Sequence, residues 1–258
     1  MSVFSVQQGN SPIVLGQPHG GTHVPDAIAA RLNPNGQLLA DTDWHINALY
    51  DGLLPGTTVV QSHIHRYVID ANRDPGGVSL YPGQNTTTLV PLTDFDGRDI
   101  WSEGQQPGPD EIAERRDRYH APYHAALASE LDRVHALHGF VILYDCHSIR
   151  SQIPFLFDGT LPDFNIGTND GITCARDIQT RVANACTAPF TTVENARFKG
   201  GWTTRHYGQP DQNRHAIQME LAQSTYLAAE KPPWSLTPER LRPHLARILS
   251  ALSNWTPT

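Results

Sequence analysis

The sequence is poor in cysteine, in charged side chains and in long apolar runs. Its three cysteines show no CxxC spacing, so neither a disulfide framework nor a cysteine zinc site is predicted. Only 17% of the residues are charged and the net charge is -7, which argues against a nucleic-acid partner because such a partner calls for a basic face. No apolar stretch approaches the roughly 20 residues of a membrane span, and Met1–Val6 lacks the basic and apolar regions of a secretory signal. We therefore expect a cytoplasmic protein without a membrane or nucleic-acid partner.

The length and composition predict one large domain, residues 1–258, with many loops. The 258 residues can bury a substantial core, and the 20 glycines and 20 prolines point to extensive irregular structure. Residues 75–109 show no steady periodicity and are too many for an ordinary connection. We expect an ordered functional loop or lid there, anchored by Tyr81, Leu89, Phe95, Ile100 and Trp101.

Three apolar segments of strand length end in polar side chains that can do chemistry. Pro12–Gln17 leads to His19, and His215–Glu220 ends in a carboxylate. The segment Phe140–Arg150 begins with an apolar run and continues into Asp145, His147, Ser148 and Arg150. Ligands of open α/β sheets bind outside the carboxyl ends of the strands, so these ends predict a site. Further strand-like segments are Thr57–Gln61, Tyr67–Ile69 and Thr191–Glu194, whereas the helical spacing falls on Asp26–Leu32, Asp43–Leu53, Asp110–Leu137, Thr173–Cys186 and Pro238–Leu252. We expect an α/β fold with a mixed, mostly parallel sheet flanked by helices.

Two imidazoles and a carboxylate from separate segments predict a hydrolytic metal site. Zinc in such a site takes three protein ligands and leaves a fourth position for water. His19 and His147 are the predicted nitrogen ligands. Asp43 is the favoured third ligand because it lies where the chain enters a helix, while Asp145 could instead orient His147. Asp41, Asp145 and His23 stay open as alternatives.

Glu220 is the predicted catalytic residue. It follows a buried strand, where a carboxylate is costly unless it pairs, binds a metal or shifts its pKa. A carboxylate near an activated water can accept its proton and hand it to the leaving amine. The simpler interpretation is a Glu that caps a turn or pairs with an arginine.

Several arginines lie in polar loops or at strand ends, where a guanidinium can grip a carboxylate with two parallel hydrogen bonds. Asn72, Arg73, Arg150 and Arg205 are the predicted substrate-binding residues, and Arg66 shares their setting. Since the chain is acidic overall, such local cations would be needed to hold a small-molecule substrate with carboxylates.

The order of the motifs resembles the N-formylglutamate deformylase (amidohydrolase) family over nearly the whole chain. The segments that carry this resemblance are His19-Gly-Gly-Thr-His23, Asp41-Thr-Asp43-Trp44, Tyr67-Val-Ile-Asp70-Ala-Asn72-Arg73, Ser79-Leu-Tyr-Pro-Gly-Gln-Asn-Thr-Thr87, Asp145-Cys-His147-Ser-Ile-Arg150, Arg197-Phe-Lys-Gly-Gly, Thr204-Arg-His-Tyr-Gly208 and Gln218-Met-Glu220-Leu-Ala-Gln-Ser224.

The resemblance implies hydrolysis of N-formyl-L-glutamate to formate and L-glutamate in histidine degradation, and a fold similar to zinc carboxypeptidases. In those enzymes two His and a Glu hold zinc, an Asn-Arg pair takes the substrate carboxylate, and a Glu late in the chain is the base. His19, His147, Asn72-Arg73 and Glu220 match these roles, but the expected acidic position three residues after the first His is Thr22.

Two other functions stay open. One is a zinc-dependent deacylase of another N-acyl acidic amino acid, carrying a succinyl, acetyl or formimidoyl group; bulky residues such as Tyr81 or Trp202 at the pocket would favour the smaller formyl group. The other is a metal- or acidic-ligand-binding protein without turnover, against which Glu220 and an open coordination position argue. Spacing does not predict the oligomeric state.

Overall fold

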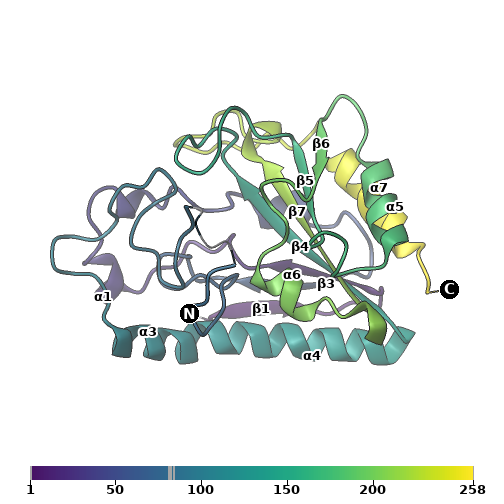
Figure 1. Cartoon of the computed structure of the whole chain (residues 1–258), viewed down its shortest axis with the longest axis horizontal. Coiled ribbons are helices and arrows are strands. Elements are labelled where there is room, and N and C mark those ends of the chain that lie inside the picture. The colour runs from purple at the N-terminus through teal and green to yellow at the C-terminus, as the bar shows by residue number, and fades with distance from the viewer. Residues whose placement is uncertain (1, 81–82, 84, 258) are drawn as a thin grey trace.

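A seven-stranded mixed sheet forms the centre of the computed structural model, which describes residues 2–80, 83 and 85–257 (Figure 1). The strand order is β1-β3-β2-β4-β7-β5-β6, with antiparallel pairing at β1/β3 and β5/β7 and parallel pairing elsewhere. The strands are β1 Phe4–Gln7, β2 Ile13–Gln17, β3 Thr58–Ser62, β4 Val141–Ile149, β5 Phe164–Gly167, β6 Thr192–Glu194 and β7 Arg214–Ala222. The expected α/β class with a mixed, mostly parallel sheet is confirmed.

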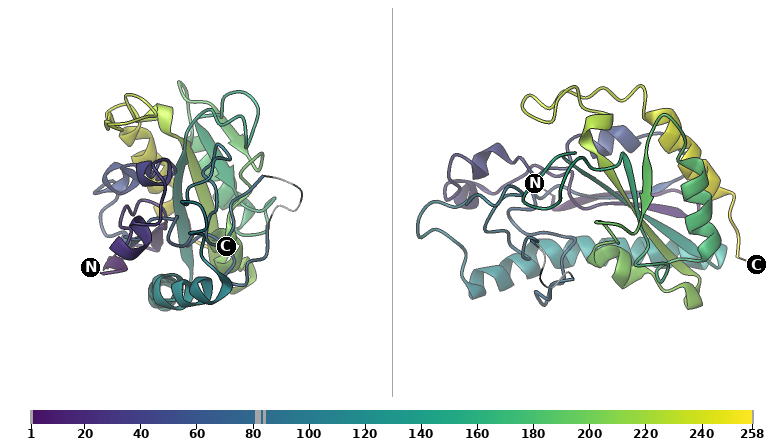
Figure 2. Two further views of the ribbon diagram at one scale, coloured as in Figure 1. Left: turned by 90° about the vertical axis from the view of Figure 1, so that its left-hand side faces the viewer. Right: turned by 45° about the horizontal axis from the view of Figure 1, so that its top comes forward.

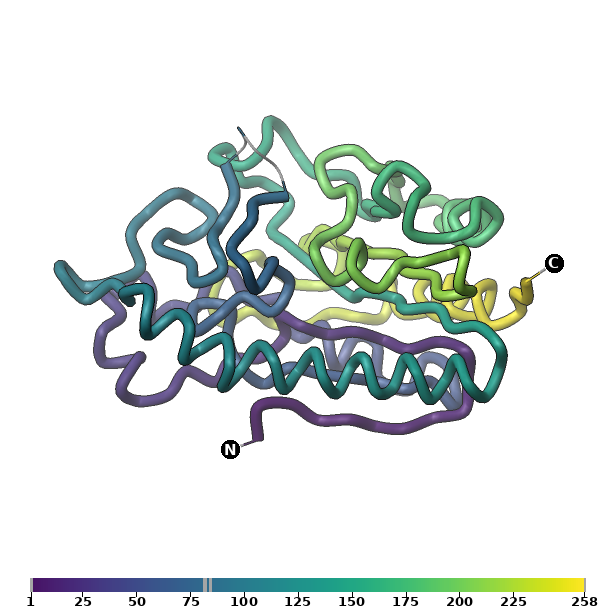
Figure 3. Tube along the Cα trace, turned by 60° about the horizontal axis from the view of Figure 1, so that its bottom comes forward, coloured from purple at the N-terminus to yellow at the C-terminus, as the bar shows by residue number. Residues whose placement is uncertain are grey.

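Helices cover both faces of the sheet, which explains why its central strands are buried on both sides. One face packs against α4 Ala121–His138, which continues from α3 Pro109–Arg115 through the π-helical segment η2 Arg116–His120 as one rod (Figure 3). The other face packs against α2 Ile46–Tyr50, α5 Arg176–Ala185 and α7 Arg242–Ser253, the last two side by side (Figure 2). The remaining helices are α1 Asp26–Ala29, α6 Trp202–Tyr207 and the short η1 Gly36–Leu38, η3 Pro210–Gln212 and η4 Gln223–Thr225.

The side chains of β4 alternate between these two cores. Val141 and Leu143 join the cluster on the α4 face, whereas Ile142 and Tyr144 join the cluster beneath α5 and α7. This alternation follows from the two-residue repeat of a strand. It also puts Asp145 and His147 on the same face of the strand, two residues apart.

The long segment 75–109 is anchored in an apolar cluster that is separate from the two clusters on the faces of the sheet. Leu89, Ile100 and Trp101 are buried with Ile28 and Leu32, and the Trp101 indole donates a hydrogen bond to Pro91 O at 2.9 Å. Phe95 is also buried, so four of the expected anchors hold their places. The fifth, Tyr81, lies outside the described residues.

The prediction of a strand at Tyr67–Ile69 is wrong. These residues form a turn and an irregular stretch, although their side chains are only 0–3% exposed. They are buried in the cluster beneath segment 75–109 and pair with no strand, so the apolar pattern reflects burial and not sheet pairing. The elements β1, β5 and α6 were not predicted. Among the described residues, no helix has both the length and the apolar character that crossing a bilayer requires.

Candidate metal centre and active site

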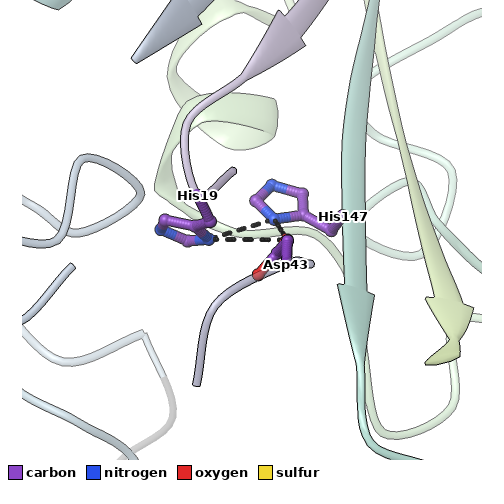
Figure 4. Close-up of side chains that lie close together, drawn as sticks. All are labelled: His19, Asp43 and His147. Carbon is purple, nitrogen blue, oxygen red and sulfur yellow. Dashed lines mark hydrogen bonds and ion pairs between the residues drawn. The ribbon is translucent and has the colours of Figure 1, made fainter. Parts of the chain in front are cut away.

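Three predicted ligands converge at the carboxyl edge of the parallel strands (Figure 4). His19 lies two residues beyond β2, His147 lies on β4, and Asp43 precedes α2. β2 and β4 are parallel neighbours with Gly16 opposite Asp145, so their ends deliver the two imidazoles to one place. All three side chains are buried, with exposed fractions of 0–3%.

The donor atoms have the spacing that a small divalent cation requires. His19 Nδ1 lies 3.2 Å from His147 Nδ1, and Asp43 Oδ2 lies 3.3 Å from His147 Nδ1 and 4.0 Å from His19 Nδ1. Donors at about 2.0–2.1 Å from a tetrahedral zinc are about 3.3 Å apart. The three residues could therefore hold a metal ion, with Asp43 as the acidic ligand.

Each imidazole has a carboxylate at its other nitrogen. His19 Nε2 lies 2.7 Å from Asp70 Oδ1, and His147 Nε2 lies 3.1 Å from Asp145 Oδ1. The Thr204 hydroxyl donates to Asp145 Oδ2 at 3.0 Å and holds that carboxylate in place. Histidines that bind metals usually donate their second N–H to such a partner, which fixes the ring orientation.

The surroundings of Asp43 stabilise its ionised form. Burial alone would raise the pKa of this carboxyl, but the Arg66 guanidinium at 2.5 Å from Oδ1 and the two imidazoles hold the pKa below its usual value. The Ser148 backbone N–H donates to Oδ2 at 2.9 Å. An ionised buried carboxylate is the state that a metal ligand needs.

The pKa values of the two imidazoles shift in opposite directions. Burial and the positive charge of Arg66 lower the pKa of His19, which favours the neutral form that a metal ligand needs. Burial also opposes charge on His147, but Asp145 and Asp43 raise its pKa well above the usual value. The anionic surroundings thus favour positive charge at this point.

Glu220 lies beside the three candidate ligands on the neighbouring strand. Its Cα is the register partner of His147 in the β4/β7 pair, and its side chain is 6% exposed. Burial raises the pKa of this carboxyl to about 8, and the Gln218 amide donates to Oε2 at 2.9 Å. A carboxyl poised near neutral pH is suited to proton transfer.

A partly enclosed pocket opens over this centre. Its lining includes His19, His147 and Glu220 together with polar groups and an apolar wall from several loops: Arg66, Asn72, Arg73, Asn85, Thr86, Thr87, Phe95, Ser148, Ile149, Leu156, Arg197, Phe198, Gly201 and Gln218. Segment 75–109 contributes four of these, so part of this segment borders the pocket. Trp202 is not part of this lining; it stacks on His206 with ring centroids 4.3 Å apart.

The structure brings Asn72 and Arg73 to the pocket, but not the other two predicted arginines. Asn72 Nδ2 lies 3.1 Å from His147 Nε2, and Arg73 donates to Thr87 O and Oγ1 at 2.9 Å each. Arg150 instead pairs with Asp96 at 3.0 Å, and Arg205 donates to Gly200 O at 2.9 Å. Neither of these two is among the described residues that line the pocket.

The alternatives for the third ligand have other partners. Asp41 accepts hydrogen bonds from the Tyr67 hydroxyl and the Phe95 N–H. His23 lies in the lining of a different hollow, beside Gly21 and His63. Asp145 lies beside Nε2 of His147, where it can orient the ring. Among the described residues the cluster of potential metal ligands is therefore His19, Asp43 and His147.

Two further residues that lie at the candidate site, Asp70 and Arg197, were not assigned from the sequence. Asp70 stands two residues before Asn72 in the motif Tyr67–Arg73. An acidic residue so close to the Asn-Arg pair was the sequence feature that could have indicated it. Arg197 lies in the same Gly-containing loop as Arg205, and its guanidinium donates to Leu156 O at 3.0 Å and Asn85 O at 3.1 Å where three loops meet.

Comparison with known proteins agrees with the family resemblance. A family model described as N-formylglutamate amidohydrolase matches residues 11–227. The N-formylglutamate deformylase of Pseudomonas aeruginosa is 43% identical over 98% of this chain and 97% of its own length, and that of Pseudomonas putida is 42% identical over 98% and 96%. A crystal structure of N-formylglutamate amidohydrolase from Ralstonia eutropha JMP134 superposes with a TM-score of 0.79 at 24% identity, covering 98% of this chain and 96% of that one. A gene product of Agrobacterium tumefaciens superposes with a TM-score of 0.73 at 16% identity, and these two likenesses concern the fold.

Proposed function

The chain belongs to the N-formylglutamate amidohydrolase family and is therefore an amide hydrolase, and we propose that it cleaves N-formyl-L-glutamate to formate and L-glutamate at a divalent metal held by His19, Asp43 and His147. The observation that carries the metal proposal is the triangle of buried donor atoms at 3.2, 3.3 and 4.0 Å. The carboxypeptidase-like description of the fold stays a prediction.

Zinc is the metal that the donor set favours. Two imidazole nitrogens and one carboxylate oxygen suit zinc, and three protein ligands leave one position open for water or substrate. A divalent cation bound there would polarise the formyl carbonyl and bring the pKa of a water near neutrality. Asp70 and Asp145 would hold the two rings in the orientation that presents Nδ1 to it.

Glu220 would move the protons of the reaction. It lines the same pocket as His19 and His147 and can accept a proton from the attacking water. The same carboxyl would then deliver that proton to the amide nitrogen as the C–N bond breaks, so that formate and a free amine leave. Arg66 lines the pocket as well, and its cationic charge favours the negative charge that develops on the formyl oxygen.

Asn72, Arg73 and Arg197 would bind the two carboxylates of the substrate. All three line the pocket, whereas Arg150 and Arg205 do not, so the proposed binding role moves from those two to Arg197. Phe95, Phe198 and Leu156 supply apolar surface for the methylene groups. Asn85, Thr86 and Thr87 complete the wall, so this part of segment 75–109 would border the bound substrate.

The three cysteines are free thiols, and two of them are buried. This fits a reducing compartment, and we propose the cytoplasm.

Formate release from N-formyl-L-glutamate, measured before and after chelation and with N-acetyl- and N-succinyl-L-glutamate in parallel, tests the proposed function. We expect the formyl substrate to be preferred and chelation to abolish turnover. A higher kcat/KM for a larger acyl group would favour the other deacylase, and retention of zinc without turnover of any substrate would favour a binding protein.

A further inference from the structure

Two buried histidines, His120 at the end of η2 and His124 in α4, contact the backbone on both sides of Asn72. His124 Nε2 lies 2.7 Å from Ala71 O, and His120 Nε2 lies 3.0 Å from Arg73 O. The two rings are one helical turn apart, with centroids separated by 4.4 Å. Among the described residues, no backbone N–H donates to either carbonyl.

The surroundings keep both rings neutral and in one orientation. Burial lowers the pKa of His120, and burial together with the neighbouring His120 lowers the pKa of His124 to about 3. The Tyr207 hydroxyl lies 3.1 Å from His124 Nδ1, which leaves Nε2–H to donate to Ala71 O. The Trp202 ring packs edge-on against His124 at 4.8 Å and prevents it from turning away.

The segment between the two carbonyls carries the side chains that face the pocket. It is a turn in which Asn72 N–H donates to Asp70 Oδ1 at 2.8 Å and Arg73 N–H donates to Asp70 O at 3.2 Å. Asn72 Nδ2 lies 3.1 Å from His147 Nε2, so a small shift of this backbone would move the amide relative to the metal centre. Turns without sheet pairing depend on side-chain hydrogen bonds for such precision.

We propose that His120 and His124 are positioning residues for substrate binding, which act by clamping the Ala71 and Arg73 carbonyls so that Asn72 and Arg73 point into the pocket. This inference rests on the proposed function, because it takes Asn72 and Arg73 as the carboxylate-binding pair. Neither histidine lines the pocket among the described residues. Their effect is therefore expected in KM, with metal content unchanged.

The test compares His124→Phe, His124→Gln and His135→Phe. His124→Phe keeps a ring against Trp202 but removes the donor, whereas His124→Gln restores an N–H. His135→Phe is the matched control, because His135 lies on the same helix and makes the same kind of hydrogen bond, to Gln212 O at 3.0 Å, away from the pocket. We expect KM for N-formyl-L-glutamate to rise about tenfold in His124→Phe with kcat within about threefold, and to return to within about threefold of wild type in His124→Gln.

A second measurement is hydrogen exchange of the Asn72 and Arg73 amides, both of which donate hydrogen bonds inside the turn. We expect these amides to exchange at least about tenfold faster in His124→Phe than in His135→Phe. If His124→Phe does not fold, as judged by circular dichroism, His120→Phe carries the same expectation through the Arg73 carbonyl.

The outcomes separate the two proposals. If wild type releases formate but His124→Phe keeps the wild-type KM and amide exchange, the clamp is overturned and the function stands. A raised KM that Gln does not restore also overturns it, because the donor would not be the cause. If wild type releases no formate, the proposed function fails, and the exchange measurement alone decides the clamp.

Discussion

Nδ1 of His19 lies 3.2 Å from Nδ1 of His147, although 128 residues separate them in the sequence. The parallel pairing of β2 with β4 causes this meeting, because it aligns the carboxyl ends of the two strands. Asp43 closes the triangle from the loop before α2, and the anionic groups behind each ring favour a cation at its centre.

The carboxylates behind the rings should tune metal affinity. Asp70→Asn keeps the shape of the side chain but removes the charge that faces His19 Nε2, so we expect zinc affinity to fall about 10–100-fold. Competition with a zinc-binding dye measures this. Asp74→Asn is the control, because its carboxylate accepts from Gly76 N–H within the loop and Asp74 is not among the described residues that line the pocket. Equal affinity in Asp70→Asn and wild type would exclude Asp70 from the centre.

Glu220→Gln should separate chemistry from metal binding. The amide keeps the volume of the side chain and its place beside Gln218 but cannot accept a proton, so we expect kcat to fall about 10²-fold or more. Metal content and the KM should stay close to wild type. A variant that retains its zinc and full kcat would show that another group transfers the proton.

Arg197→Ala and Arg73→Ala should weaken substrate binding. A guanidinium bound to a carboxylate contributes about 1.5–3 kcal/mol, so each change is expected to raise KM about 10–100-fold and leave the metal content intact. Arg176→Ala, at an exposed position on α5, is the matched control. Steady-state kinetics with N-formyl-L-glutamate measure these effects. An unchanged KM in Arg197→Ala would show that another residue binds the second carboxylate of the substrate.

Acid should destabilise the protein through His124. Its folded pKa is about 3 against an unfolded value of 6.5, so the unfolded chain binds the extra proton between these values and stability falls as pH drops below 6.5. At pH 4.5 the loss from this group is about 2–3 kcal/mol. His124→Gln does not titrate, so urea unfolding at pH 7 and pH 4.5 should show a smaller acid loss in the variant. Equal losses in both proteins would place the acid sensitivity elsewhere.

The sequence predicts the side chains that converge at the candidate site better than it predicts the elements around them. His19, His147 and Glu220 follow or end strongly apolar strands, and apolar runs of that length report burial directly. The family resemblance is confirmed by the comparisons. The strands β1 and β5 have only four residues each, which is too short for a clear alternating pattern. The pairing that makes them strands joins β1 to β3, and β5 to β6 and β7, none of which directly follows them in the chain.

The arginines show why spacing could not assign the pocket. Arg197 and Arg205 share one polar, Gly-containing loop in the sequence, and nothing local distinguishes them. In the structure Arg205 lies in α6, which begins at Trp202, whereas Arg197 precedes this helix and lines the pocket. The prediction of a strand at Tyr67–Ile69 failed for a related reason. Residues buried by a distant loop show the same apolar sequence pattern as residues buried in a sheet.

Zinc titration into the chelated protein, followed by both metal content and formate release, tests the central claim most directly. We expect activity to return in proportion to bound zinc and to reach its maximum at one equivalent, and His147→Ala to bind no zinc at this site and to recover no activity. Full formate release from the metal-free protein, or from a folded His147→Ala variant, would contradict the shared metal centre.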